Sequence, residues 1–572
     1  MKVILGLNAY HADSSASIFI DNKLIASVEE ERFNRIKHWS GFPVNSIKFC
    51  LNEAGVSIND VTDITINSNP YSNLQKKITY SLKKLNFYNF YKYINRAKKK
   101  FLIEKDVQKH FGRGSYDIHR VDHHLSHIWS GFAPSGFSNC LCISVDGMGD
   151  FCSIVVAECD KSKSQNIKIL QKIYYPNSLG IFYEAITQYL GFRSYGDEYK
   201  MMGLSSFGEP IFKKKLLQLF HSDFELQNNF FNHTKNNFTY QFSGIPKQEF
   251  LLDESFFNSF FAPREKDQNI ENHHINIAAS AQSIFEDKLF KLIDKFSYLK
   301  QKNLVLVGGC AMNSVCNGKI SMQKKFENIF IPAFAGDNGG SIGSSIYYLN
   351  KIGIKEFSNI SNPYLGPSFD NFEIKKVIND NICSSKFEIL DLENEDRMIQ
   401  KVTDLLVDGN IIGWFQGKME IGSRALGNRS IICDPRLQNA RDLINTKIKF
   451  REKFRPFAPS IMEEYVLDWF VKKQLSPYMS FVIDFKEEKK KLVPAIVHVD
   501  GTGRLQTVSY KNNKLYYNLI KSFFKKTDVP IILNTSFNEN EPIVCKPIEA
   551  INTFLRTSMD VLVMNNYVVV RK

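Results

Sequence analysis

One order of strands and turns occurs twice in the N-terminal part of the chain. It begins with an apolar run, continues with a polar loop that carries an aspartate, and ends in a hairpin. The first copy has apolar runs at Val3–Leu7, Ser17–Ile20 and Lys23–Val28. The second copy has them at Cys140–Val145 and Phe151–Cys159. Two such copies predict a duplicated α/β domain in which Asp13 and Asp146 lie in comparable loops.

The rest of the chain continues this domain and then forms a second one. The stretch Ile275–Leu299 has apolar residues at helical spacing, and two short buried strands after it lead into glycine-rich turns. A stretch with two prolines and no periodicity then separates the domains. We predict a first domain, a linker and a second α/β domain at residues 1–352, 353–370 and 371–572. The first domain contains two insertions, at about 71–105 and 220–261.

The charge balance and the cysteine pattern narrow the functional classes. Lys and Arg number 73 against 60 Asp and Glu, and the excess of +13 suits phosphates, nucleic acid or a membrane surface. No window reaches the ~18 consecutive apolar residues of a transmembrane helix, and the first apolar run is too short for a secretory signal. The ten cysteines contain no CxxC pair, which argues against zinc ribbons. We expect a cytoplasmic enzyme with reduced thiols and no membrane partner.

A histidine cluster is the candidate metal site. The sequence DHHLSH ends at His127, and on a helix His123 and His127 would lie one turn apart on the same face. A pair with this spacing is also common as a purely structural feature. Two aspartates in glycine-flanked loops, Asp146 and Asp337, could complete a set that suits Fe(II), Mn(II) or Zn(II).

Two glycine-rich turns follow buried strands in the first domain. They are GGCAMN, which starts at Gly308, and GDNGG, which starts at Gly336. Glycine lets the backbone approach a ligand closely, and a strand that leads through such a turn into a helix suits a phosphate or nucleotide. The alternative is a pair of tight turns without a ligand. The candidate cofactor-binding residues here are Gly308, Gly309, Asn313 and Gly336.

In the second domain, cations are interleaved with Gly, Pro and Phe in the segments Gln416–Ser430 and Lys449–Ser460. A charged run is usually a solvated face, but this pattern does not form a periodic surface helix. Guanidinium groups bind phosphate bidentately, and a triphosphate needs several of them. The candidate phosphate ligands are Lys418, Arg424, Arg429, Arg451, Lys453 and Arg455.

Two segments nearer the C-terminus add further candidates. HVDGTGRLQTV supplies Arg504, and ILNTSFNENEPIV supplies Asn534 and Ser536 directly after a buried strand. Each segment could equally be ordinary turn chemistry. The segment Tyr71–Lys105 is different, because it holds ten Lys or Arg and one acid among many aromatic residues. It suits either a solvated helical insertion or a surface for an anionic substrate or nucleic acid.

These motifs together carry a family resemblance. The chain contains, in order, NAYHADSSA, DHHLSHIWSGFAPSGF, SVDGMGD, LGFRSYGDEYKMMGL, GGCAMN, GDNGG, GKMEIGSRALGNRSI, FRPFAPS and NTSFNENEPIV. The set resembles the O-carbamoyltransferases of the NodU/CmcH type over nearly the whole chain. The resemblance implies an N-terminal domain similar to the TsaD-like members of the actin/hexokinase-type fold and a C-terminal domain similar to the YrdC-like fold. The two insertions match nothing diagnostic, and we expect them to carry substrate choice.

The resemblance implies a two-step reaction. The YrdC-like domain would use ATP with magnesium and carbamoyl phosphate to make carbamoyl-adenylate, and the TsaD-like domain would transfer the carbamoyl group to an acceptor hydroxyl. A mixed anhydride with AMP supplies the stabilised leaving group that carbamate lacks. Family acceptors include aminoglycosides, cephems, macrocyclic antibiotics and nodulation oligosaccharides. We therefore expect a small-molecule or sugar acceptor, whose identity the sequence does not reveal.

The resemblance also assigns roles to the candidate residues. The phosphates would be neutralised by Lys418, Arg424, Arg429, Arg455 and Arg504. The carbamoyl group or the α-phosphate would be oriented by Asn534 and Ser536, and GGCAMN would cradle the adenosine. The metal, generally iron and acting as a Lewis acid, would be held by His123, His127, Asp146 and Asp337. Many relatives have Arg where this chain has Lys418, which would make a point contact rather than a fork.

The acceptor hydroxyl needs a base, and His11 matches a family position in the first polar loop. The alternative for His11 is a loop histidine that makes one hydrogen bond. Weaker candidates for contacts with the acceptor or the nucleotide are Asp13, Asp197, Glu198 and Lys200.

Two other functions stay open. One is a tRNA-modifying enzyme of the related threonylcarbamoyl class, with the basic segment as its nucleic-acid surface. The other is a non-catalytic nucleotide-binding module on an actin-like fold. The fused architecture and the NTSFNENEPIV segment favour the carbamoyltransferase. We therefore expect ATP, carbamoyl phosphate and the acceptor as partners, with no nucleic acid, and a homodimer as a possible assembly.

Overall fold

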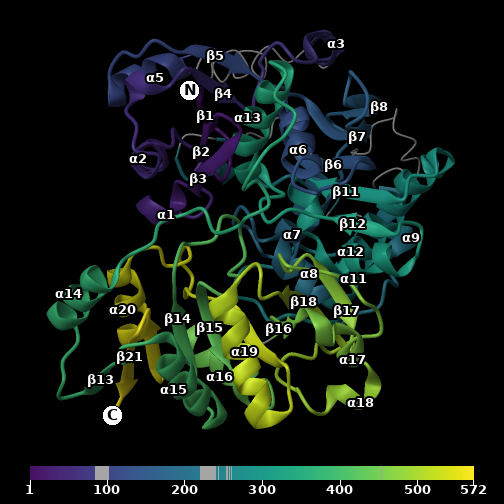
Figure 1. Ribbon diagram of the computed structural model, residues 1–572. Helices are drawn as coiled ribbons and strands as arrows, with labels where there is room; N and C mark the ends of the chain where they lie inside the picture. The colour runs from purple at the N-terminus through teal and green to yellow at the C-terminus, as the bar shows by residue number, and fades with distance from the viewer. Residues whose placement is uncertain are drawn as a thin grey trace. The chain divides into compact units, whose positions relative to one another are not determined.

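The computed structural model describes residues 1–83, 102–219, 240–241, 244–252, 256, 258, 260–452 and 454–572. Lys453 and most of the two stretches predicted as insertions lie outside the described residues. The chain divides into two compact units (Figure 1). Unit 1 consists of Met1–Asn313 and Gln323–Ser361, and unit 2 consists of Ser314–Met322 and Asn362–Lys572. A short helix from the middle of the chain therefore belongs to unit 2.

Unit 1 contains two five-stranded sheets with the same topology. The first sheet consists of β1 (Val3–Asn8), β2 (Ser15–Ile20), β3 (Lys23–Glu29), β4 (Asp63–Ile66) and β5 (Asp117–Arg120). The second consists of β6 (Asn139–Gly149), β7 (Cys152–Asp160), β8 (Ile167–Tyr174), β11 (Asn303–Val307) and β12 (Asn328–Phe330). A further two-stranded ribbon joins β9 (Tyr240–Gln241) and β10 (Lys247–Gln248).

The strand orders β3-β2-β1-β4-β5 and β8-β7-β6-β11-β12 correspond strand for strand. In each sheet the first three strands form an antiparallel meander, and the last two strands run parallel to the first strand of that meander. This repeat confirms the duplicated α/β domain that the sequence predicts. One detail differs, because β6 continues through Asp146 with irregular pairing between Val145 and Gly149.

Two helices pack between the sheets of unit 1 and position the candidate site. Helix α13 (Gly340–Lys351) packs on the first sheet and α6 (His123–Phe132) on the second, and the two helices also pack against each other (Figure 1). A Cβ on Gly343 would lie 1.8 Å from the Ser126 carbonyl oxygen, so this close crossing requires glycine. The other helices are α1 (Glu31–Asn34), α2 (Val44–Glu53), α3 (Leu74–Lys83), α5 (Ile103–Phe111), α7 (Leu179–Tyr189), α8 (Glu198–Ser205), α9 (Lys213–Leu219) and α11 (Asn272–Lys295).

Unit 2 is built on a nine-stranded mixed sheet of order β13-β21-β20-β14-β15-β19-β16-β18-β17. Its strands are β13 (Phe387–Asp391), β14 (Ile412–Phe415), β15 (Arg429–Cys433), β16 (Ala458–Met462), β17 (Phe481–Asp484), β18 (Thr502–Val508), β19 (Ile531–Ser536), β20 (Val561–Met564) and β21 (Tyr567–Arg571). Its helices are α12 (Ser314–Met322), α14 (Asn371–Asn381), α15 (Glu395–Val407), α16 (Ala440–Leu443), α17 (Val466–Trp469), α18 (Glu487–Lys490), α19 (Lys514–Thr527) and α20 (Pro547–Arg556).

The chain is thus an α/β protein in both units, as the sequence predicts. Several of its helices begin after a side chain that accepts from free backbone N–H groups, such as Asn394 before α15 and Asn513 before α19. Strands such as β1 and β14 are buried along their whole length, which explains why their sequences are continuous apolar runs. Among the described residues, we find no helix with the length and apolarity needed to cross a membrane.

Candidate functional site

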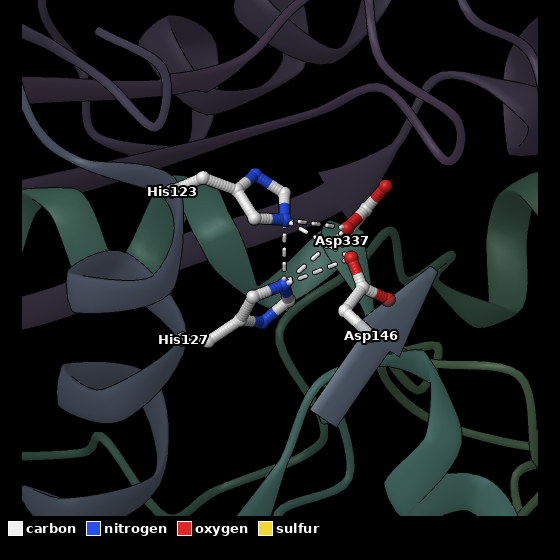
Figure 2. A group of neighbouring side chains, drawn as sticks. All are labelled: His123, His127, Asp146 and Asp337. Atoms are coloured by element: carbon white, nitrogen blue, oxygen red, sulfur yellow. Dashed lines mark hydrogen bonds and ion pairs between the residues drawn. The ribbon is translucent and has the colours of Figure 1, made fainter. Parts of the chain in front are cut away.

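Four side chains of unit 1 meet in one compact group (Figure 2). His123 and His127 lie one turn apart on α6, Asp146 lies on β6, and Asp337 begins the short 3-10 turn before α13. The Nε2 atoms of the two histidines are 3.0 Å apart, and each lies 3.4 Å from Asp337 Oδ1. Asp146 Oδ2 lies 3.2 Å from His123 Nε2 and 3.9 Å from His127 Nε2. One donor atom from each residue therefore points at a common centre.

The charges in this group stabilise one another. Burial alone would lower the pKa of His123, but the hydrogen bond to Asp146 and the charge of Asp337 outweigh burial and raise that pKa to about 9. Burial and the Asp337 charge would raise the pKa of Asp146, but the two histidines outweigh both and lower it to about 2. Burial would also raise the pKa of Asp337, but His11, His127 and His123 outweigh burial and hold that pKa well below its usual range. Both carboxylates are therefore ionised at neutral pH, as metal ligands must be.

The group fits a divalent metal ion. Asp337 Oδ1 is buried and accepts no hydrogen bond from any described residue. The two Nε2 atoms face each other at 3.0 Å, an arrangement in which two neutral imidazoles can share only one proton. A cation would accept a lone pair from each of these atoms. Two imidazole nitrogens and two carboxylate oxygens suit Fe(II), Mn(II) or Zn(II).

Two aspartates and one glycine hold the histidine helix in place. The Asp122 carboxylate caps α6 by accepting from the backbone N–H groups of His124 and Leu125. The Asp150 carboxylate accepts from the backbone N–H of His123 at 3.0 Å and from that of Asn69 at 2.8 Å. A Cβ on Gly149 would lie 1.9 Å from the His123 ring, so this position must stay glycine. His124 bonds to Ser144 and the Cys152 carbonyl and lies outside the group.

His11 lies beside the metal-type group. Its Nδ1 is 3.3 Å from Asp337 Oδ2, and its ring stacks on the ring of His123 at 4.8 Å. Two residues further along, Asp13 Oδ1 lies 2.8 Å from Nδ1 of His38. Burial would lower the pKa of His38, but Asp13 outweighs it and raises that pKa to about 9. The first polar loop therefore places His11 beside the metal-type group, and Asp13 of the same loop pairs with His38.

The two glycine-rich turns also reach this group. The backbone N–H of Gly309 donates to Asp146 Oδ1 at 3.0 Å, and Gly336 directly precedes Asp337. Gly308 has a φ of 88° and leaves no space for a Cβ, which would lie 2.2 Å from the Val145 carbonyl oxygen. The Asn313 amide exchanges two hydrogen bonds with the Gln282 amide. The glycines thus shape the turn, and Asn313 ties it to α11.

Unit 2 gathers several of the predicted cations around Arg504. Burial lowers the pKa of Arg504 well below its usual range, and the positive charges of Arg424, Arg455 and Arg451 lower it further. The Arg504 Nε donates to Ser314 Oγ, and Arg451 Nε donates to Asn445 Oδ1. Like charges repel each other, so such an accumulation favours a bound anion. Arg424, Arg451 and Arg455 thus lie near enough to Arg504 for their charges to act on it, and their role as phosphate ligands stays a prediction.

Three other predicted residues of unit 2, Arg429, Asn534 and Ser536, donate from their side chains to other groups of the protein. The buried Arg429 guanidinium donates to four backbone carbonyls of its own region. The Asn534 amide donates to the Ala425 carbonyl and to Gln506 Oε1. Lys418 lies in the same loop as Arg424, and its carbonyl accepts from the Asn428 amide. Ser536 Oγ donates to Asn538 Oδ1 at 2.7 Å.

Three residues of these sites escape the sequence reasoning. His38 reaches Asp13 from a different part of the chain, so no local pattern reveals it. Lys449 opens the segment KFREKFRPFAPS, and its buried Nζ donates to Asn538 Oδ1 and to the carbonyls of Ser536 and Asn538. Glu420 lies among the cations of GKMEIGSRALGNRS and accepts from three backbone N–H groups. The sequence does contain a signal for Glu420, because a single acidic residue among many cations indicates a structural role.

Two family models match most of the chain. The model described as "Carbamoyltransferase N-terminus" matches residues 3–346, and the model described as "Carbamoyltransferase C-terminus" matches residues 403–571. The chain is also 35% identical over 573 residues to the nodulation protein NolNO of Sinorhizobium fredii, covering 99% of this chain and 80% of that protein. It is 36% identical over 458 residues to the nodulation protein NolO of Bradyrhizobium diazoefficiens, covering 78% of each chain.

Solved structures align with this chain only loosely. Component A of the (R)-2-hydroxyglutaryl-CoA dehydratase of Acidaminococcus fermentans aligns with 61% of this chain and 99% of its own, at a TM-score of 0.33 and 12% identity. The family matches, in contrast, cover both units. The chain belongs to the carbamoyltransferase family and is a carbamoyltransferase enzyme.

Proposed function

We propose that this carbamoyltransferase uses ATP and carbamoyl phosphate to carbamoylate a hydroxyl group of a small-molecule or sugar acceptor. Carbamoyl phosphate would be hydrolysed to carbamate and phosphate in unit 2. A carbamate oxygen would then attack the α-phosphorus of ATP, giving carbamoyl-adenylate and releasing pyrophosphate. In unit 1 the acceptor oxygen would attack the carbamoyl carbon, and AMP would leave. The relatives are named as nodulation proteins, and these names identify no acceptor for this chain.

The observation that carries this proposal is the arginine cluster of unit 2. A triphosphate and carbamoyl phosphate together bring more negative charge than one guanidinium can neutralise. The positive charges of Arg424, Arg451 and Arg455 all contribute to lowering the pKa of Arg504, so they would act together on a bound polyanion. Fixed positive charges at this place would stabilise the charge that develops on the departing pyrophosphate. Magnesium would accompany ATP as part of the substrate.

The metal-type group of unit 1 supports the transfer step. His123, His127, Asp146 and Asp337 would hold Fe(II), with Mn(II) or Zn(II) as alternatives. When bound, such an ion supplies Lewis-acid polarisation of a phosphate or carbonyl oxygen. The glycine-rich turns lie beside this group, because the Gly309 N–H donates to Asp146 Oδ1 and Gly336 directly precedes Asp337. Their lack of side chains would let the adenylate approach the backbone closely.

His11 is the proposed base for the acceptor hydroxyl. Its Nδ1 faces Asp337 Oδ2 at 3.3 Å, a contact that would fix the orientation of the ring toward the acceptor. The same carboxylate would stabilise the imidazolium after the proton has moved from the acceptor oxygen. His11 is buried beside the metal-type group, so an acceptor that reaches it also reaches the carbamoyl donor.

A transfer assay tests this proposal. We would incubate the full chain with Fe(II), magnesium-ATP, carbamoyl phosphate and a panel of hydroxyl-bearing sugars and small molecules, with tRNA as a separate arm. The expected product is one acceptor whose mass rises by a single carbamoyl group only when ATP is present. An O-carbamate is cleaved by alkali, and a carbamoylated amine is not. An alkali-stable product, or modification of tRNA alone, would overturn the proposed O-transfer.

A further inference from the structure

The loop that carries Arg424 is held by two buried side chains of opposite charge, Glu420 and Arg429. The loop joins β14 to β15 over residues 416–428, and Arg429 is the first residue of β15. Glu420 is 2% exposed and Arg429 is 0% exposed. A loop of this length contains many backbone N–H and C=O groups, and each buried one needs a partner. The Glu420 carboxylate accepts hydrogen bonds from N–H groups, and the Arg429 guanidinium donates to C=O groups.

Glu420 satisfies N–H groups on the far side of Arg424. Its Oε1 accepts from the backbone N–H of Leu426 at 2.7 Å, of Asn428 at 2.8 Å and of Arg429 at 3.3 Å. Its Oε2 makes no hydrogen bond with any described residue. A carboxylate with three backbone donors fixes the turn that follows Arg424, and its charge is balanced in part by Arg429, whose pKa it helps to raise.

Arg429 satisfies carbonyl groups at both ends of the loop. Its Nη1 donates to the carbonyls of Gln416 and Asn428, and its Nη2 donates to those of Pro367 and Gly417, at 2.5 to 3.1 Å. The guanidinium also stacks over the Phe415 ring, 3.7 Å from its centroid. Burial lowers the pKa of Arg429 to about 10, so it remains a cation. Its remaining donor, Nε, is buried and meets no acceptor among the described residues.

Two side-chain amides bind the backbone of the two residues that follow Arg424. Asn534 Nδ2 donates to the carbonyl of Ala425 at 3.2 Å, and Gln506 Nε2 donates to the carbonyl of Leu426 at 2.9 Å. Asn534 Nδ2 also donates to Gln506 Oε1 at 2.9 Å, which joins the two amides. The two residues after Arg424 are thus held by side chains from β18 and β19 and by Glu420.

We propose that Glu420 and Arg429 are positioning residues that fix Arg424 for binding the anionic substrate, and that Arg429 does not contact the anion. The inference rests on the proposed anion site of unit 2. It changes the role that residue type alone assigns to Arg429, since all four of its Nη bonds go to backbone carbonyls. Arg424, in contrast, lies close enough to Arg504 to lower its pKa.

A double-mutant cycle on the full chain tests this role. The probe is inorganic tripolyphosphate, whose affinity is measured by calorimetry for Arg424→Ala, Arg429→Ala and the double variant. Each single change should weaken binding by about tenfold or more, the value of one charge-assisted hydrogen bond. The double variant should bind within about twofold of Arg424→Ala, because Arg429 acts only through Arg424. The exposed Arg397 supplies the control, and Arg397→Ala should bind like the wild type.

Two conservative variants keep the test decisive if Arg429→Ala fails to fold. Glu420→Gln keeps the shape of the side chain and should weaken binding only while Arg424 is present. Arg429→Lys keeps the charge but loses the planar fork, and it should bind as weakly as Arg429→Ala. Thermal unfolding of each variant separates lost anion affinity from lost folding.

Three results would overturn the proposal. A double variant whose loss equals the product of the single losses would place Arg429 in contact with the anion, and so would wild-type affinity in Arg429→Lys. Wild-type protein that does not bind tripolyphosphate would overturn the anion site itself, together with this inference. That outcome is visible before any variant is made, so the two failures are distinguishable.

Discussion

The metal-type group of unit 1 and the arginine cluster of unit 2 are held in place in different ways. In unit 1 the candidate metal ligands His123 and His127 come from one helix, and Asp146 comes from a strand. In unit 2, Arg424 comes from a loop whose backbone is satisfied by buried side chains. Regular elements fix a small set of ligands at short distances. A loop can surround a larger, flexible anion, but it then needs its own internal charges to hold its shape.

The change with the largest expected effect removes a ligand from unit 1. His127→Ala should reduce metal affinity by more than the ~10–100-fold typical of changes beside a metal ligand. Carbamoyl transfer should be lost with the metal, whereas carbamoyl-phosphate-dependent pyrophosphate release in unit 2 should continue. Metal content and pyrophosphate release are measured on the same preparation, with the exposed His110→Ala as control. Equal loss of both half-reactions in a folded variant would contradict the division between the units.

The complementary change removes a cation from unit 2. Arg504→Ala should slow adenylate formation by about 10²–10³-fold, the usual cost of losing one fixed donor at a developing charge. Transfer from chemically supplied carbamoyl-adenylate should persist, because unit 1 is unchanged. Both rates are measured with the Arg397→Ala variant alongside. If supplied carbamoyl-adenylate is also no longer consumed, Arg504 serves more than the activation step.

A smaller effect is expected from crowding the histidine helix. In Gly149→Ala the new Cβ would lie 1.9 Å from the His123 ring and would displace it. We expect metal affinity to fall by about 10–100-fold, as for other changes that reorient a ligand. Gly147→Ala is a matched control two residues away, because a Cβ there meets nothing within 4 Å. Equal metal affinity in the two variants would show that the position of His123 is not set by this contact.

The smallest effect is expected from the carboxylate that ties α6 to the Asn69 backbone. Asp150→Asn keeps the side-chain shape but weakens its hydrogen bonds to the N–H groups of His123 and Asn69. We expect a loss of about 1–2 kcal/mol in the free energy of unfolding, with a modest loss of metal affinity. Denaturant unfolding and metal titration measure the two effects. An unchanged unfolding free energy would show that this capping interaction contributes nothing to unit 1.

Much of unit 1 could be predicted because its signals are local or repeated. The two histidines have the spacing of one helical turn, and the repeat of strands and loops is visible in the apolar runs. The pairing of Asp13 with His38 could not be predicted, since it joins two loops that only the folded sheet brings together.

Side-chain direction limits what could be predicted in unit 2. Arg424 and Arg429 are five residues apart and have the same side chain, yet only Arg424 of the two contributes to the lowered pKa of Arg504. Arg429 begins a buried strand, and its guanidinium donates to backbone carbonyls there. A buried carbonyl without a hydrogen bond would destabilise the fold. Residue type identifies the candidate ligands. Which of them can bind a ligand depends on whether their side chains already form hydrogen bonds with buried backbone groups.

The most direct test of the two-step reaction needs no knowledge of the acceptor. We would incubate the purified full chain with magnesium-ATP and Fe(II), with or without carbamoyl phosphate, and separate the nucleotides. The account predicts AMP and pyrophosphate only when carbamoyl phosphate is present. Formation of ADP, or no turnover with Fe(II), Mn(II) or Zn(II), would contradict activation of the carbamoyl group as an adenylate.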